Sequence, residues 1–199
     1  MREIALFVED FGHEEFLNAL LQRVADEYGI EVRIKAYSVR RGYGKVITEL
    51  KKYLRDLQRH KTNLLDLVVV ATDANCKGMN ERQKEIIHAA TGDAVIPIPM
   101  IYAIPDPHIE RWLLIDSAAF KEVFGKGCPA PDHKCEKKRY KQLLLNAIRE
   151  AGITPPLGGL EYSSDIVKAM DLKRMERADE SLGKFLKDLQ ALFRSWQPA

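Results

Sequence analysis

The chain has 199 residues, of which 46% are hydrophobic and 30% are charged, with a formal net charge of +2. This length can bury a full core, and we expect one main domain. The small net charge does not by itself indicate a nucleic-acid partner. Since no apolar run is long enough to span a bilayer and the start lacks the regions of a signal peptide, we expect a cytoplasmic protein without membrane contact.

Strand and helix patterns alternate from the start of the chain. Residues Ile4 to Val8 predict a buried strand, and Glu14 to Tyr28 carry apolar residues at helical spacing before Gly29. Residues Ile30 to Tyr37 alternate between apolar and polar side chains, which is typical of a half-exposed strand. These patterns predict a strand, an acidic loop, a helix and a second strand.

A loop with two glycines and three cations follows, with the sequence SVRRGYGK from Ser38 to Lys45. Small residues allow a phosphate to approach the backbone, and Arg40, Arg41 and Lys45 supply positive charge. The alternative is a solvated turn before the next helix.

The middle of the chain repeats the alternation. Val46 to Gln58 predicts an amphipathic helix, Leu65 to Ala71 a buried strand, and Asn80 to Ala90 a helix. Ala94 to Ile104 contains Pro97 and Pro99, so we expect an irregular strand at a sheet edge.

The second half is mainly helical. Asp106 and Pro107 predict a helix start, with Asp106 as the N-cap of a helix that reaches Phe120. A polar loop from Gly125 to Lys138 precedes three expected helices, over Tyr140 to Ala151, Ser164 to Met170 and Arg174 to Trp196. The order predicts an α/β fold with a mainly parallel sheet flanked by helices. Residues 1–120 form its core, and residues 121–199 form a loop and helical C-terminal region packed on it.

The three cysteines, Cys76, Cys128 and Cys135, are an odd number and indicate reduced thiols more than a disulfide framework. With His133, and with His108 or Cys76 as a fourth ligand, Cys128 and Cys135 have the residue types of a zinc site. Because the spacing lacks a paired CxxC motif, we do not expect zinc.

Acidic residues follow both buried strands. Glu9 and Asp10 end the first, with Glu14 close behind, whereas Asp73 and then Asn75 end the second. Because ligands of open α/β sheets bind beyond the carboxyl ends of the strands, we expect these groups to converge. Their oxygens suit Mg²⁺ or Mn²⁺. The alternative is that Asp73 caps a turn while Glu9 and Asp10 face solvent.

Two segments resemble a known family. The stretch VEDFGHEEFL, which begins at Val8, and the segment ERWLLID, from Glu110 to Asp116, are similar to those of small stand-alone Toprim-like proteins of the RloB and abortive-infection kind, relatives of OLD nucleases. The resemblance covers roughly residues 3 to 120. The chain departs from the family in having Asp10 where a glycine is usual, and Asn75 where an aspartate completes an Asp-x-Asp pair.

The resemblance implies a metal-dependent nuclease. Glu9 would act as general acid/base, and Asp73 and Asn75 would hold Mg²⁺. By the same resemblance, Glu110 and Asp116 are further candidates for the site. It also implies a role in phage defence and an ATPase partner. On this reading, replacing Glu9 or Asp73 with alanine abolishes cleavage and leaves the melting curve nearly intact.

Two other functions stay open on the residues alone. The first is a non-catalytic module that binds nucleic acid or a nucleotide and tolerates Asn75 because no chemistry is needed. A basic flank for either reading comprises Lys134 and Lys138 together with Arg40, Arg41 and Lys45, unless these cations belong to solvated loops. The second is a zinc-stabilised interaction protein.

Overall fold

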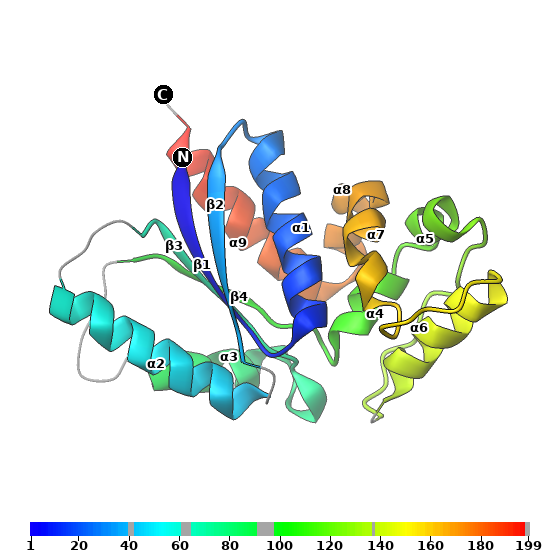
Figure 1. Ribbon diagram of the computed structural model, residues 1–199, viewed down its shortest axis with the longest axis horizontal. Helices are drawn as coiled ribbons and strands as arrows, with labels where there is room; N and C mark the ends of the chain where they lie inside the picture. Colours follow the sequence, from blue (N-terminus) through cyan, green and yellow to red (C-terminus); the bar gives the residue numbers. More distant parts are fainter. Residues whose placement is uncertain (40–41, 61–64, 91–97, 137, 198–199) are drawn as a thin grey trace.

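The computed structural model describes residues 1–39, 42–60, 65–90, 98–136 and 138–197. Its centre is a parallel four-stranded sheet with the strand order β2-β1-β3-β4 (Figure 1). The strands are β1 (Arg2–Val8), β2 (Val32–Ser38), β3 (Leu67–Ala71) and β4 (Met100–Ala103). Arg40 and Arg41, expected to bind phosphate, lie outside the described residues.

The strands end in register. Val8 is paired with Ser38 on one side and with Ala71 on the other, and Ala71 is paired with Ala103. The chain therefore leaves all four strands at one edge of the sheet, which we call the carboxyl edge.

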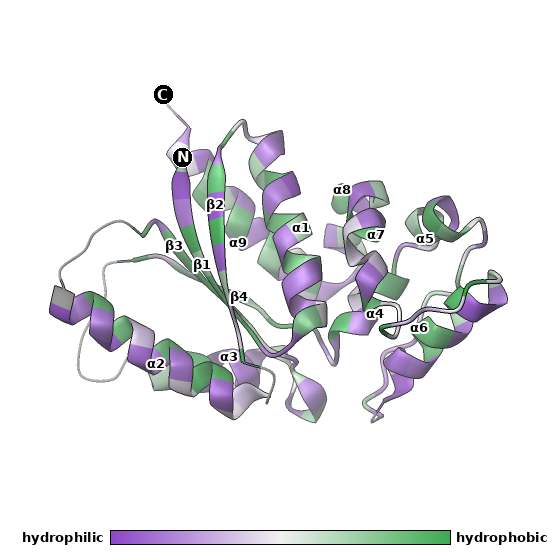
Figure 2. Ribbon diagram, viewed as in Figure 1, coloured by the Kyte–Doolittle hydropathy of each residue, from purple (hydrophilic) through white to green (hydrophobic). Residues whose placement is uncertain are grey.

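Helices cover both faces of the sheet (Figure 1). Helices α1 (Phe11–Glu27) and α9 (Glu180–Trp196) pack on the face that receives Ile4, Leu6 and Val8. Helices α2 (Tyr43–His60) and α3 (Met79–Ala90) pack on the other, which receives Ala5 and Phe7. Since successive strand residues point to opposite faces, a strand covered on both sides is apolar where it is covered, as β3 and residues 4–8 of β1 are (Figure 2).

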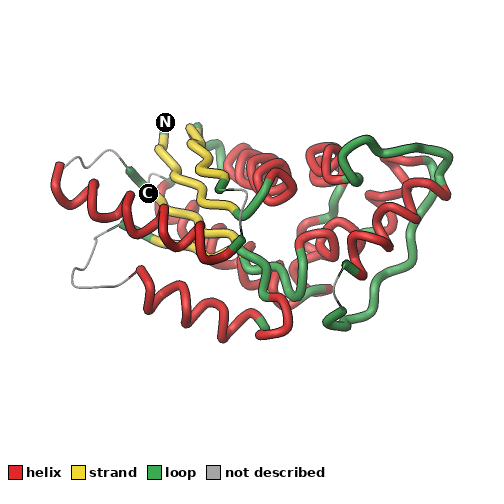
Figure 3. The backbone as a smooth tube through the Cα atoms, turned by 60° about the horizontal axis from the view of Figure 1, so that its bottom comes forward, coloured by secondary structure: helices red, strands yellow, loops and turns green. Residues whose placement is uncertain are grey.

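The C-terminal part is helical, as expected. Besides α9 it contains α4 (Ile109–Leu114), α5 (Ser117–Phe124), α6 (Arg139–Glu150), α7 (Ser163–Ala169) and α8 (Leu172–Ala178). A short 3₁₀ turn at Leu160–Tyr162 precedes α7, and another, at Asn75–Lys77, lies earlier in the chain between β3 and α3. Helix α7 packs against α1 and α5, and α9 also contacts β4. Helices α4 to α8 form a group beside the sheet, joined by long loops (Figure 1 and Figure 3).

The expected helix start at Asp106 was wrong. The Asp106–Pro107 peptide bond is cis, and α4 begins at Ile109 with His108 in the capping position. The Asp106 carboxylate instead accepts a hydrogen bond of 3.1 Å from the backbone N–H of Met79, at the start of α3. Asp106 therefore joins two loops at the carboxyl edge.

Two expected helices are each divided by an aspartate. Asp116 separates α4 from α5 and accepts hydrogen bonds from the N–H groups of Ala118 and Ala119. Asp179 separates α8 from α9 and accepts one from Leu182. Apolar periodicity continues across such breaks, so it did not reveal them.

The expectation of reduced thiols was also wrong for two cysteines. Cys76 and Cys135 form a disulfide between the 3₁₀ turn after β3 and the loop before α6, whereas Cys128 is a buried free thiol. Because Cys135 is bonded to Cys76, its sulfur is not a free thiolate for the zinc set considered from the sequence. Among the described helices, none is long and apolar enough to cross a membrane.

Candidate active site at the carboxyl edge

The loop after β1 turns directly into α1. Asp10 is the N-cap of this helix, and its side chain accepts a hydrogen bond of 3.1 Å from the N–H of His13. Helix α1 thus begins earlier than the apolar spacing indicated, and this places His13 in its first turn, facing the end of β3.

His13 is a buried link between the two acidic loops. Its side chain is 1% exposed, with Nδ1 2.9 Å from Asp10 Oδ1 and Nε2 3.1 Å from Asp73 Oδ1. Burial acts to lower the pKa of His13, but the charge of Asp73 and the hydrogen bonds to both carboxylates raise it well above its usual value. The imidazole is therefore protonated, which is how a buried histidine between two carboxylates is stabilised.

The Asp73 carboxylate accepts three hydrogen bonds from the described residues. Besides His13, His108 Nδ1 lies 3.0 Å from Oδ2, and the N–H of Ile109 donates to Oδ1 at 3.0 Å. Burial acts to raise the pKa of Asp73, but the charge of His13 and the bond from His108 outweigh it, so that the pKa is lowered. The bond to Asp73 also raises the pKa of His108. Asp73 is an ionised carboxylate fixed by two histidines.

Glu9 differs from its neighbours. Its Oε1 atom is buried and has no hydrogen-bond partner within the described residues. Burial raises the pKa of Glu9 to about 7, with the charge of Asp73 adding to it and that of His13 opposing it. By contrast, the bonds from His13 outweigh burial at Asp10 and lower its pKa to about 2. One of these adjacent acids can exchange a proton near neutral pH and the other stays ionised.

The two acids of the ERWLLID segment lie in different places. Glu110 is in the first turn of α4, where burial and the nearby charge of Asp73 raise its pKa. Asp116 is buried at the start of α5, where it pairs with Arg174 and accepts a bond from the N–H of Asp171. Asp116 thus holds helices together, and none of these contacts is with Glu9, Asp73 or Glu110.

Asn75 shapes the loop after β3. Its backbone is left-handed, with φ of 52°, and its side-chain Nδ2 donates to the carbonyl of Asp73 at 3.2 Å. Its N–H donates to the carbonyl of Pro107 at 3.0 Å. Asparagine tolerates this conformation better than most residues, because its short polar side chain can bond locally. Glu14 lies in the first turn of α1, half-buried.

The basic residues have separate surroundings. Lys45 lies in the first turn of α2, in an open hollow with Tyr37 and Ser38 near the carboxyl edge. Lys134 pairs with Asp132 at 3.3 Å, in the loop that the disulfide ties beside the site, and Lys138 is exposed just before α6.

The donor chemistry fits a hard divalent cation, but the side chains do not form a closed cage. Glu9, Asn75 and Glu110 would supply oxygens, and the buried Oε1 of Glu9 lacks another partner. Both oxygens of Asp73, however, already accept hydrogen bonds. Within the described ranges, no three His, Cys, Asp or Glu side chains are arranged to hold a metal ion. Binding would therefore require side chains to move.

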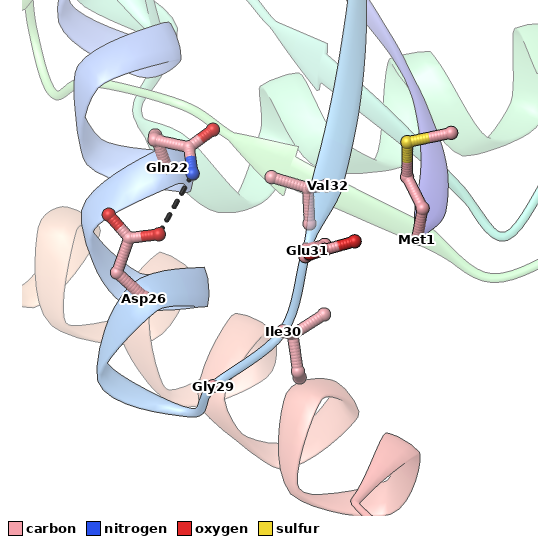
Figure 4. A pocket seen from close by; sticks show the side chains of 7 residues that line it. All are labelled: Met1, Gln22, Asp26, Gly29, Ile30, Glu31 and Val32. Atoms are coloured by element: carbon pink, nitrogen blue, oxygen red, sulfur yellow. Dashed lines mark hydrogen bonds between the residues drawn. The ribbon is translucent and has the colours of Figure 1, made fainter.

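Another hollow, of about 430 Å³, lies at the opposite edge of the sheet (Figure 4). Met1, Glu31 and Val32 line it on the strand side, and Gln22 and Asp26 of α1 face each other across a hydrogen bond of 2.9 Å. Because it lies at the amino ends of β1 and β2, it is separate from the acidic cluster.

Sequence reasoning missed His13 as a site residue and considered His108 only for zinc. One signal for His13 was available: it stands three residues after Asp10, the spacing between an N-cap and the third residue of a helix. The contact of His108 with Asp73 depends on the loop after β4, for which the sequence offered no comparable signal.

Fold and site define a parallel α/β protein with an ionised aspartate, two histidines and two half-buried glutamates at the carboxyl edge. The family described as "Domain of unknown function (DUF4276)" matches residues 8–190, and the chain belongs to it. No curated protein and no solved structure matches the chain significantly.

Proposed function

We propose that the protein is a Mg²⁺- or Mn²⁺-dependent nuclease that hydrolyses phosphodiester bonds of nucleic acid. The observation that carries this proposal is the meeting of Glu9, Asp73 and Glu110, from three separate segments, at the edge where α/β sheets bind ligands. The Toprim-like resemblance of the same segments supports it.

Each residue has a role that follows from its surroundings. Glu9, with a pKa of about 7, is suited to accept the proton of an attacking water and later to protonate the leaving oxygen. Asp73 holds His13 and His108 in fixed orientations at the edge. Glu9, Glu110, Asn75 and, after rearrangement, Asp73 would hold the cation. When bound, the cation would stabilise the negative charge that develops on the phosphate.

The alternative is a non-catalytic module that binds nucleic acid or a nucleotide. The observation that favours it is that three donors already bind the Asp73 carboxylate, together with Asn75 in place of an acid. In this case the site needs no metal, and the histidines serve stability alone.

Metal binding and cleavage separate the two functions. We would titrate the protein with Mn²⁺ and Mg²⁺ by calorimetry, and assay single- and double-stranded DNA and RNA for cleavage. A nuclease shows metal-dependent cleavage that Glu9→Gln abolishes and Glu31→Gln, an exposed carboxylate at the opposite edge, leaves unchanged. Binding of nucleic acid without metal binding or cleavage would select the alternative.

Substrate and resemblance also suggest a cytoplasmic location, a role in phage defence and an ATPase partner. The Cys76–Cys135 disulfide is more typical of oxidising compartments, so the redox state of these cysteines in rapidly quenched cells is a direct test of location. Affinity purification from phage-infected cells would test the partner.

A further inference from the structure

Beside the acidic cluster, two cations share one carboxylate. Arg82 of α3 donates from Nη1 to Glu85 Oε2 at 2.8 Å, and Lys77, from the 3₁₀ turn after β3, donates to the other oxygen of Glu85. Each oxygen of this carboxylate thus has its own cationic donor.

The guanidinium of Arg82 is fixed on several sides. Its Nε donates to the backbone carbonyl of Asp73 at 3.2 Å, and its Cζ lies 4.1 Å from the centre of the Tyr43 ring. Its side chain is 7% exposed, and its positive charge acts on Glu9. A planar cation stacked and bonded in this way is pre-organised to bind an oxyanion.

The carboxylate partner is less enclosed than the arginine. The Glu85 side chain is 34% exposed, and that of Lys77 is 55% exposed. Solvent therefore reaches the anion that two cations hold. An anion arriving from solution can take the place of Glu85 without unpacking the core, because Glu85 can swing outward on its flexible side chain.

We propose that Arg82 and Lys77 form a phosphate-binding subsite that Glu85 fills in the free protein. A phosphate group has more negative oxygens than a carboxylate and matches the fork of an arginine, so it competes well for these donors. Since Arg82 is bonded to Asp73, a phosphate bound there lies next to Glu9 and Asp73. The subsite rests on the proposed function for its ligand, a backbone phosphate of nucleic acid adjacent to the bond to be cleaved.

The test is a binding measurement without metal, which keeps it independent of cleavage. Fluorescence anisotropy in EDTA would follow labelled single-stranded DNA and RNA oligonucleotides, with inorganic phosphate and a mononucleotide as competitors. Lys77→Ala should weaken oligonucleotide binding about tenfold, the size of one charge-assisted bond. It should also reduce the salt dependence by about 0.7 in the log–log slope, as expected for one lost contact with a single strand. Glu85→Gln should tighten binding, because it removes the internal competitor.

The same helix offers a matched control. Lys84 and Glu81 form an ion pair of 2.6 Å between side chains that are 71% and 62% exposed. Lys84→Ala and Glu81→Gln should leave the affinity unchanged. Arg82→Lys keeps the positive charge and removes the two-pronged guanidinium, so it tests the shape of the arginine. If this variant of a buried residue folds poorly, the variants of Lys77 and Glu85, whose side chains are partly exposed, still decide the test.

The outcomes separate this subsite from the proposed function. Binding that weakens with Lys77→Ala and strengthens with Glu85→Gln supports the subsite, even if no metal-dependent cleavage is found. If inorganic phosphate and the mononucleotide compete as strongly as an unlabelled oligonucleotide, the subsite is supported, and its ligand is a free phosphate group and not the nucleic-acid backbone. Affinity that is insensitive to Glu85→Gln, equal effects of Lys77→Ala and Lys84→Ala, or no binding of any phosphate compound would overturn it.

Discussion

His13 and Asp73, separated by 60 positions, are joined by a hydrogen bond of 3.1 Å beneath the carboxyl edge. His13 lies at the start of α1, and Asp73 follows β3, so this bond ties together the ends of two neighbouring strands. A link of this kind gives Asp73 a structural role besides any chemistry.

Asp73→Ala should therefore destabilise the fold. The substitution removes the acceptor of His13, His108 and the Ile109 N–H, and leaves a buried imidazolium with one partner. We expect a loss of about 2–4 kcal/mol in the free energy of unfolding, measured by urea denaturation. An unchanged urea midpoint would contradict this and would agree with the expectation from the sequence, in which Asp73→Ala removes activity and leaves stability nearly intact. A double-mutant cycle of Asp73→Ala and His13→Ala should show strong coupling between the two positions in the free energy of unfolding.

Glu9 should make the stability of the metal-free protein fall as pH rises. Its pKa is raised from 4.5 to about 7, so the folded protein binds this proton more tightly than the unfolded chain does. Its contribution is favourable below the lower value and is lost as pH rises through the upper one. Relative to Glu9→Gln, the wild type should lose up to about 3 kcal/mol across this window. Unfolding curves in EDTA at a series of pH values give this difference, and parallel curves for the two proteins would contradict it.

Asp116→Asn should lower stability without affecting the site. The carboxylate is fully buried, caps α5 and pairs with Arg174. Loss of its charge should cost about 1–3 kcal/mol, seen as a lower melting temperature. Nucleic-acid binding at a temperature where the variant is folded should equal that of the wild type. If the variant is as stable as the wild type and yet fails to bind nucleic acid, Asp116 is a residue of the site.

The disulfide should stabilise the protein and hold the basic loop near the site. Cys76 and Cys135 are 59 residues apart, so their bond constrains a long segment of the unfolded chain. Removing it with Cys135→Ser should cost about 2–4 kcal/mol in the free energy of unfolding. A reducing agent should lower the melting temperature of the wild type and leave that of the variant unchanged. Equal responses of the two proteins would show that this bond is absent in solution.

The amino-acid sequence by itself determined the α/β architecture and one edge of the site. Apolar runs ending in acids predicted β1 and β3 because a strand buried on both faces has few polar residues until it leaves the sheet. Parallel pairing then brings the ends of such strands together, and this is why the closeness of Glu9 and Asp73 was predictable. The helix breaks at Asp116 and Asp179 were not, because an aspartate at a cap and one on a helix surface look alike in an apolar repeat.

Only the tertiary structure decided which polar groups meet. Glu110 and Asp116 stand six positions apart in one motif, yet one lies beside Asp73 and the other holds α5 to Arg174. His13 of α1, Arg82 of α3 and His108 of the loop before α4 meet Asp73 because long-range packing brings these segments together. The pairing of Cys76 with Cys135 likewise requires two segments 59 residues apart to bring their sulfur atoms within bonding distance. Such contacts depend on distances in space, which local periodicity does not contain.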